Sequence, residues 1–255
     1  MNPSELTAVV LIAGCGTRIR DVVAEPKSLL QVGGETIINR HLRLFGEVGI
    51  RKVILVVGYK KELILRTIEP FRESLDITIV ANDDYTTLGN GVSLQMGIEA
   101  TDGPVLVFDG DLIYARDILE RFASEAHPTS VVVGKASIDD IECTKPMLDA
   151  KGFIRLFVDK RAVTEEELER FTFAGEAMGI LKFSDADRLS LLALCKEFYS
   201  VPERQLLNWE HVLNCFLPKH DVWSHFDDSE AWIEIDTPED YEDAKEKAGL
   251  LNKEG

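Results

Sequence analysis

Residues 8–18 read AVVLIAGCGTR, and this stretch decides the fold. Its first five residues form a continuous apolar run, which is typical of a β-strand buried on both faces of a parallel sheet. Glycines at positions 14 and 16 follow, and Arg18 closes the stretch. Small residues let backbone N–H groups approach phosphate oxygens, so the pattern predicts a strand followed by a phosphate-binding loop. It is neither a P-loop nor a dinucleotide fingerprint, because the G-K-[ST] ending and the third glycine are both missing.

The same kind of strand recurs along the first half of the chain and alternates with amphipathic segments. Apolar runs predict further strands at 52–57, 77–80, 105–108 and 130–133, and helical spacing predicts helices at 36–48, 60–71, 90–100 and 116–126. This alternation predicts an α/β fold with a Rossmann-like, mostly parallel sheet flanked by helices. In such sheets ligands bind at the carboxyl ends of the strands.

Beyond about residue 140 the rhythm changes. A hairpin is expected at 147–158, with helices at 164–171, 185–199 and 209–216 and strands at 177–183 and 232–235. Thr237 and Pro238 predict the cap and first turn of a last helix. Since no linker or repeat interrupts the chain, we expect one domain over residues 1–255, with a small antiparallel insert over the substrate cleft.

Composition narrows the classes of function. Lys and Arg number 28 against 45 Asp and Glu, which gives a net charge of −17 and argues against partners that are nucleic acids or anionic membranes. No secretory signal and no apolar run near the ~20 residues of a membrane span is present. The four widely spaced cysteines predict reduced thiols in a cytoplasmic protein: Cys15, Cys143, Cys195 and Cys215.

Several motifs together resemble a known family. Ala13-Gly14, Gly16-Thr17-Arg18 and Pro26-Lys27 resemble the A-A-G-x-G-T-R and P-K signature of nucleotidyltransferases that join an NTP to a phosphorylated small molecule, with Ile12 in place of the first alanine. The resemblance continues over nearly the whole chain, at 32–38, 58–60, 109–111, 175–180 and 232–240. It implies that residues 1–135 mainly bind nucleotide, 136–235 mainly bind the acceptor, and 236–255 form a C-terminal helix.

Within the family, the chain most resembles bacterial phosphocholine and phosphonate cytidylyltransferases. Asn90-Gly91-Val92-Ser93-Leu94, Trp209-Glu210 and Glu234-Ile235-Asp236 carry this likeness. It implies transfer of CMP from CTP to phosphocholine or to a phosphonate such as 2-aminoethylphosphonate, with release of pyrophosphate. A sugar-1-phosphate enzyme using UTP, dTTP or GTP and a catalytically silent nucleotide-sensing subunit remain alternatives, and the sequence leaves monomer and homodimer open.

The resemblance also assigns roles on the nucleotide side. Lys27 is expected to stabilise charge on the α- and β-phosphates, and Arg18 to hold the β/γ end. The acceptor supplies its own phosphate or phosphonate oxygen as nucleophile, so no catalytic Ser, Cys or His is required. The remaining residues expected to bind nucleotide are Ile12, Ala13, Gly14, Gly16, Thr17, Asn90 and Ser93, although Asn90 alone also fits a helix cap.

Acidic and aromatic residues complete the expected site. Asp109 and Asp111 follow a buried strand, and carboxylates are suitable ligands for Mg²⁺. The resemblance favours Asp111 as a ligand, with Asp236 as its partner and Glu234 as a helper. The residues expected at the acceptor are Lys145 and Lys160 for its phosphate and Glu176, Trp209 and Glu210 for a cationic end, with Tyr114 a weaker candidate.

Overall fold

Strand β1 (Thr7–Ile12) lies inside the parallel half of a ten-stranded sheet. It pairs in parallel with β4 (Lys52–Val57) on one side and β6 (Val105–Asp109) on the other, and β5 (Asp76–Ala81) extends the sheet beyond β4. All six residues of β1 are buried, which explains why its sequence is apolar throughout rather than alternating. The structure is a computed structural model that describes residues 2–16, 18–19 and 25–251.

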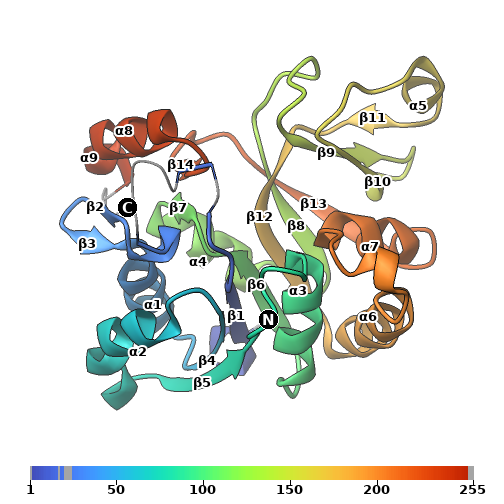
Figure 1. Cartoon of the computed structure of the whole chain (residues 1–255). Helices are drawn as coiled ribbons and strands as arrows, with labels where there is room; N and C mark the ends of the chain where they lie inside the picture. Colours follow the sequence, from blue (N-terminus) through green and yellow to red (C-terminus); the bar gives the residue numbers. More distant parts are fainter. Residues whose placement is uncertain (1, 17, 20–24, 252–255) are drawn as a thin grey trace.

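Helices cover both faces of this half (Figure 1). Helices α1 (Ile37–Val48), α2 (Lys61–Ile68) and α4 (Arg116–Ser124) pack one apolar cluster against one face. Helices α3 (Asn90–Glu99), α6 (Asp185–Phe198) and α7 (Trp209–Phe216) pack a second cluster against the other. The expected α/β architecture is therefore confirmed, with a sheet between two helical layers.

The direction of the sheet reverses at β12 (Glu176–Phe183). This strand pairs antiparallel with both β6 and β8 (Ser130–Gly134). Beyond β8 follow β13 (Val222–Asp227), β10 (Phe153–Asp159), β9 (Thr144–Leu148) and β11 (Thr172–Phe173), with α5 (Glu165–Arg170) between β10 and β11 in sequence. The predicted antiparallel strands thus continue the main sheet, and only the β8–β13 pair is parallel in this half.

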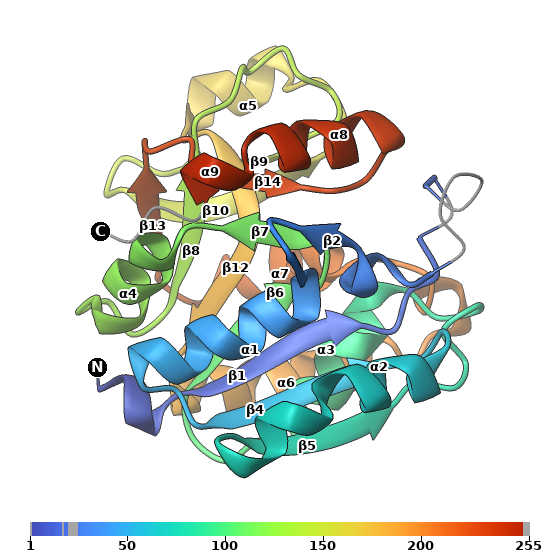
Figure 2. The same cartoon turned by 90° about the vertical axis from the view of Figure 1, so that its left-hand side faces the viewer.

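A two-stranded ribbon lies apart from the main sheet and joins distant parts of the chain. β7 (Leu112–Tyr114) pairs antiparallel with β14 (Trp232–Glu234). Helices α8 (Pro238–Glu246) and α9 (Ala248–Leu251) follow, and Figure 2 shows them beside this ribbon. Thr237 caps α8 as predicted, in a reciprocal capping box with Asp240.

Short elements complete the chain. β2 (Gln31–Val32) and β3 (Glu35–Thr36) form a small hairpin before α1. The 3₁₀ turns are η1 (Pro3–Glu5), η2 (Lys27–Leu29), η3 (Glu69–Glu73) and η4 (Pro202–Arg204). Across the described residues, no helix has both the length and the apolar character needed to cross a membrane.

One predicted helix ends early, and one expected cap residue lies inside its helix. The helix expected over residues 60–71 ends at Ile68, because Pro70 cannot donate a helical hydrogen bond, and a 3₁₀ turn continues instead. Asn90 does not occupy the N-cap of α3; Gly89 does, and Asn90 is the first helical residue.

Candidate active site

The ribbon β7–β14 brings together two carboxylates that lie far apart in sequence. Asp111 leads into β7, while Asp236 follows β14, and the Ile235 N–H donates a hydrogen bond of 3.0 Å to the Asp111 carbonyl. One carboxylate oxygen from each of Asp111, Glu234 and Asp236 lies within 4.8 Å of the other two. The structure thus gathers the three carboxylates expected to hold a metal.

Lys27 bridges two of these carboxylates. Its Nζ lies 2.9 Å from Asp111 Oδ2 and 2.6 Å from Asp236 Oδ1. Burial alone would lower the pKa of Lys27, but the charges of Asp111 and Asp236 outweigh it and raise that pKa. Lys27 is therefore held charged, at a position where it neutralises two acids.

Arg18 and Lys160 approach the same carboxylate from other elements. The Arg18 Nη2 lies 2.5 Å from Asp236 Oδ2, and the Lys160 Nζ lies 3.8 Å from the same oxygen. Burial acts to raise the pKa of Asp236, but Lys27 and Arg18 more than compensate and lower it. Asp236 is thus the centre of the charge cluster.

The glycine-rich loop is shaped around the Lys27 side chain. Gly16 has a φ of +59°, and a Cβ there would lie 2.8 Å from Lys27 Cγ, so the position requires glycine both for its backbone and for space. Gly14 has open space around it. Lys27 starts the 3₁₀ turn η2 directly after Pro26, which fixes the point where its side chain leaves the backbone.

Ile12 and Ala13, also expected to bind nucleotide, lie at the carboxyl end of β1. Ile12 and Gly14 line a small cavity of about 100 Å³ together with Lys27 and Asp111. Ala13 is buried, and its carbonyl accepts the Tyr59 N–H at 3.0 Å. Thr17, also expected to bind nucleotide, lies outside the described residues.

A cleft of about 400 Å³ runs from this loop to α7. It is lined by residues from both halves of the sheet, and its Asp109, Gly110 and Asp111 belong to the turn after β6. The expected site residues that line it are Gly14, Gly16, Arg18, Lys27, Asn90, Asp111, Lys160, Glu176, Trp209, Glu210, Glu234 and Asp236.

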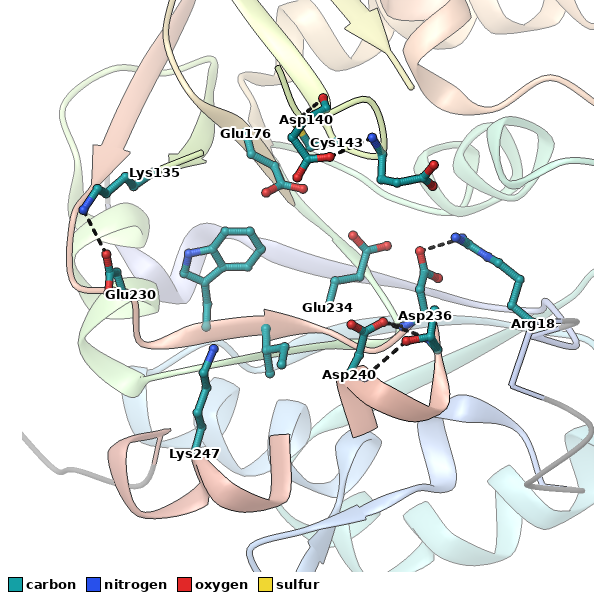
Figure 3. Close-up of a pocket in the computed structure, with 14 residues that line it drawn as sticks. Arg18, Lys135, Asp140, Cys143, Glu176, Glu230, Glu234, Asp236, Asp240 and Lys247 are labelled. Carbon is teal, nitrogen blue, oxygen red and sulfur yellow. Dashed lines mark hydrogen bonds and ion pairs between the residues drawn. The ribbon is translucent and has the colours of Figure 1, made fainter. Parts of the chain in front are cut away.

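A second cavity of about 460 Å³ adjoins the first and shares part of its wall. Figure 3 shows Glu176 and Glu234 approaching it from opposite sides, with Arg18 and Asp236 at one end. At the other end, Lys135 Nζ and Glu230 Oε1 form an ion pair of 3.1 Å. The two cavities together leave room beside the metal-ligand candidates for a substrate larger than a nucleotide alone.

Several carboxylates on the α7 side of the cleft carry raised pKa values. Burial and then Asp159 raise the pKa of Glu210 to about 8, and burial and then Asp140 raise the pKa of Glu176 to about 7. Burial, Asp111 and Glu210 also raise the pKa of Asp109. Burial is the main cause of these raised pKa values, and neighbouring carboxylates add to it.

Glu234 belongs to the same pattern. Glu234 is an exposed residue that lines the cleft, yet the protein surrounds its carboxyl group closely. This desolvation, together with the charges of Asp111 and Asp236, raises the pKa of Glu234. A divalent cation would relieve this crowding, which fits the expected role of the three carboxylates.

Asn90 and Trp209 connect the two sides of the cleft. The Asn90 Oδ1 accepts the Trp209 N–H at 3.0 Å, so its side chain satisfies an N-terminal donor of α7. The Trp209 indole N–H donates to Asp109 Oδ2 at 3.2 Å, and its ring is almost wholly buried. Trp209 therefore orients Asp109, in addition to being part of the core.

Three of the expected polar residues do not reach the cleft. Ser93 is buried and its hydroxyl accepts from Asn82 Nδ2 at 3.1 Å. Lys145 is fully buried on β9, and its Nζ donates to the carbonyls of Cys143 and Arg161 at 3.3 and 3.1 Å. Tyr114 is buried in β7, with its hydroxyl 3.0 Å from His41 Nδ1. Their polar atoms serve the interior, so we do not retain them as ligand-binding residues.

The structure adds residues that sequence reasoning did not assign. Thr144 lines the cleft, with its hydroxyl 2.9 Å from Asp159 Oδ1 and 3.4 Å from Glu210 Oε1. Asp109 lines it too, and its position in the D-G-D turn was a signal, although Asp111 was preferred as the metal ligand. Nothing in the sequence around Thr144 distinguishes it from an ordinary strand residue.

The α/β fold and its cleft belong to a nucleotidyltransferase domain, as comparison with known families shows. Comparison with family models places the chain more narrowly: it belongs to the family of the MobA-like NTP transferase domain, whose model matches residues 8–180. That match covers more than half of the 255 residues, including the glycine-rich loop, Lys27 and the D-G-D turn.

Curated relatives and solved structures agree with this assignment. The chain is 32% identical over 155 residues to a CMP-5'-(3-aminopropyl)phosphonate synthase of Streptomyces rubellomurinus, covering 60% of this chain and 24% of that protein. It is 29% identical over 243 residues to a bifunctional IPC transferase and DIPP synthase of Thermococcus kodakarensis, covering 93% and 49%. The chain thus spans less than half the length of either relative.

Two solved structures share the fold over nearly the whole length. The inositol-1-phosphate CTP transferase from T. maritima superimposes with a TM-score of 0.76 at 19% identity, covering 99% of this chain and 100% of the other. The CTP:phosphocholine cytidylyltransferase from Streptococcus pneumoniae has a TM-score of 0.75 at 21% identity, covering 95% and 98%.

Proposed function

We propose that this chain is a Mg²⁺-dependent cytidylyltransferase that transfers CMP from CTP to a phosphorylated or phosphonate small molecule and releases pyrophosphate. The observation that carries the proposal is the placement of Lys27 between Asp111 and Asp236, beside the glycine-rich loop. A lysine poised next to a potential metal site is suited to a triphosphate, because phosphoryl and nucleotidyl transfer depend on positioning and on charge stabilisation.

The reaction needs little acid–base chemistry from the protein. An oxygen of the acceptor's phosphate or phosphonate attacks the α-phosphorus of CTP, the new P–O bond forms, and the bond to the β-phosphate breaks. Its electron pair leaves with pyrophosphate. Lys27 would stabilise the charge on the α- and β-phosphates, and the exposed Arg18 would hold the pyrophosphate end.

The donor set fits a magnesium ion. Asp111, Glu234 and Asp236 offer only oxygen ligands, and these lie within 4.8 Å of one another. When held by these carboxylates and the phosphates, Mg²⁺ neutralises part of the triphosphate charge. Lys27 would then give up its two ion pairs and turn its charge to the phosphates, since both carboxylates that it contacts belong to this set.

The choice of CTP and of the acceptor class rests on the sequence resemblance and on the names of the relatives. A curated relative is named as a CMP-phosphonate synthase, and two structural neighbours are named as CTP-using enzymes. The acceptor would lie on the side of the cleft formed by Lys160, Glu176 and Glu210, across from the Gly14–Gly16 loop.

A pyrophosphate-release panel tests the proposal. Purified protein with Mg²⁺ is offered CTP, UTP, GTP or dTTP, each with phosphocholine, phosphoethanolamine, 2-aminoethylphosphonate, 2-hydroxyethylphosphonate or glucose 1-phosphate. We expect release with CTP and a non-sugar acceptor. Faster release with glucose 1-phosphate and another nucleotide would overturn the proposal in favour of a sugar-1-phosphate enzyme, and no release with any pair would favour a silent subunit.

A matched pair of variants confirms that the activity belongs to this site. Asp111→Asn removes a proposed ligand, and Asp83→Asn removes an exposed carboxylate that pairs with Lys61 and does not line the cleft. Activity should be lost in the first variant and kept in the second. Equal activity in both would mean that the carboxylate assignment is wrong.

A further inference from the structure

Glu210 holds a buried carboxylate oxygen with no partner. The residue is only 7% exposed, yet it lines the cleft, and within the described part of the chain its Oε2 has no hydrogen-bond partner. A buried carboxylate without a partner is costly, because desolvation is not offset by a donor or a cation. Such a group indicates a ligand that carries a positive charge and donates a hydrogen bond.

Among the described residues, no cation forms an ion pair with Glu210, because Lys160 acts on its charge only from a distance and pairs with Asp236. The Glu210 Oε1 is 3.4 Å from the Thr144 hydroxyl, which makes a shorter contact of 2.9 Å to Asp159. Asp109 lines the same cleft, and the Trp209 indole supplies it with a neutral donor. This wall of the cleft therefore offers acceptors without a cation in contact.

The cleft as a whole also has more carboxylates than cations. Of the described residues that line it, three are cations and seven are carboxylates, and the contacts of the cations gather at Asp111 and Asp236. Nucleoside triphosphate and acceptor phosphate are both anionic, so they gain nothing from further acids. The acids on the α7 side match a positive charge on the acceptor instead.

Hydrogen-bond chemistry selects the kind of cation. A quaternary ammonium has no N–H and is best held by several aromatic faces. The aromatic side chains among the described lining residues are Tyr85 and Trp209, and Trp209 is 2% exposed, with Phe157 packed edge-on at 89°. An orphaned carboxylate oxygen instead suits an ammonium that donates hydrogen bonds.

We propose that the acceptor carries a primary ammonium group, which Glu210 binds through its free oxygen, and that this carboxylate selects against N-methylated and neutral acceptors. The inference rests on the proposed cytidylyl transfer and narrows its substrate class. It makes phosphocholine, the substrate named for one structural neighbour, a poor acceptor for this chain.

Two matched pairs of acceptors test the proposal. Phosphoethanolamine and phosphocholine differ only in N-methylation, and 2-aminoethylphosphonate and 2-hydroxyethylphosphonate differ only in the charged group. The ammonium member of each pair should have a kcat/KM at least about tenfold higher, the value of one charge-assisted hydrogen bond. Equal or better use of phosphocholine or of the hydroxy compound overturns the proposal.

Variants assign the selectivity to residues. Glu210→Gln keeps the shape but removes the charge, and it should abolish the preference within both pairs by lowering the ammonium member only. Glu210→Asp, which keeps the charge but shortens the side chain away from the ammonium, serves as a second variant that should also lower the preference if Glu210→Gln does not fold. Glu169→Gln, on α5 and outside the cleft, is the control that should behave as the unmodified protein.

Calorimetry separates this inference from the proposed function. Binding of 2-aminoethylphosphonate that is lost in Glu210→Gln supports the ammonium site even if no acceptor releases pyrophosphate, in which case only the proposed function fails. Absence of such binding, with turnover of the neutral acceptor, overturns the inference alone. Because Asp159, Glu210 and His211 lie within 4.8 Å, binding of Zn²⁺ that depends on Glu210 and excludes the acceptor would also overturn it.

Discussion

The two sides of the cleft treat charge in opposite ways. On the loop side, Lys27 and Arg18 contact the carboxylates of Asp111 and Asp236 at 2.5–2.9 Å, so acids and bases neutralise one another. On the α7 side, Glu210 and Glu176 are enclosed by the protein and carry raised pKa values without a cation in direct contact among the described residues.

This difference separates two tasks. The paired charges on the loop side are exchangeable under the proposed function, because a metal would take the place of Lys27 at the carboxylates and the phosphates would take the place of the carboxylates at Lys27. The unpaired acids on the α7 side would be neutralised by the proposed ammonium group of the acceptor. Carboxylates outside the cleft that pair with a cation of the protein form a third class, which stabilises the fold. Substitutions can test each class.

The largest effect is expected for Asp236→Asn. This residue contacts Lys27 and Arg18 and belongs to the proposed metal site, so its loss removes several kcal/mol of charge stabilisation and lowers kcat by on the order of 10³-fold. The rate of pyrophosphate release as a function of Mg²⁺ concentration measures it. A variant with unchanged rate and unchanged Mg²⁺ dependence would show that the loop side is only a structural ion-pair cluster.

Lys27→Met should cost somewhat less. It removes one cation at the phosphates, for which a loss of about 10²- to 10³-fold in kcat is typical. Because Lys27 now occupies two candidate metal ligands, the variant without nucleotide should bind Mn²⁺ more tightly, as measured by calorimetry. Lys61→Met, which alters an exposed pair with Asp83, is the control. Weaker Mn²⁺ binding in Lys27→Met would contradict the exchange of charges.

Gly16→Ala tests how far the loop side depends on backbone geometry. The left-handed φ of +59° costs an alanine about 1–2 kcal/mol, and the new Cβ would meet the Lys27 stem at 2.8 Å. Chemical denaturation should therefore show a lower free energy of unfolding. In Gly14→Ala the stability should stay close to that of the unmodified protein, since nothing lies within 4 Å of its Cβ position. Equal stability of the two variants would contradict the strain.

The smallest effect is expected for a carboxylate outside the cleft that does have a partner. Arg161 forms two hydrogen bonds with Glu167, and these, with the Thr164 backbone N–H, lower the pKa of Glu167 to about 2 despite partial burial. Because the folded-state pKa lies below that of the unfolded chain, the charge stabilises the fold above about pH 4.5, and this contribution is lost as the pH falls toward about 2.

Glu167→Gln should thus lower the free energy of unfolding by about 1 kcal/mol at pH 7, a value reduced for solvent screening. The difference from the unmodified protein should shrink between pH 5 and pH 3 in urea titrations. Glu166→Gln on the same helix, 81% exposed, should show no such pH dependence. A difference that grows on acidification would reverse the sign of the argument.

Much of the fold could be predicted because the central strands β1, β4 and β6 are mostly apolar and a glycine follows each within two residues. The strand at 52–57 and the helix at 209–216 have the predicted bounds. β7 and β13 were not predicted. β7 has only three residues next to a turn, and β13 reads VWSHFD, whose polar residues become strand residues only through pairing with β8.

The site was predictable where a motif fixes the backbone and less so where tertiary packing decides. Arg18, Asp111 and Asp236 follow a glycine or a strand closely and Lys27 follows a proline, and the structure brings the four together. The position of Lys145 was not predictable, because burial of its ammonium depends on the backbone carbonyls of Cys143 and Arg161. Likewise, the link from Trp209 to Asp109 joins residues a hundred positions apart and has no local signal.

The ribbon β7–β14 determines when, during synthesis of the chain, the candidate metal site can form. Every strand of the ten-stranded sheet has been synthesised once the ribosome passes Asp227, the last residue of β13. Glu234 and Asp236 emerge only afterwards, and they join Asp111 through the pairing of β14 with β7. A nascent or prematurely ended chain can therefore contain all the strands of the main sheet and still lack Glu234 and Asp236. The candidate metal site is thus the last part of the protein to be assembled.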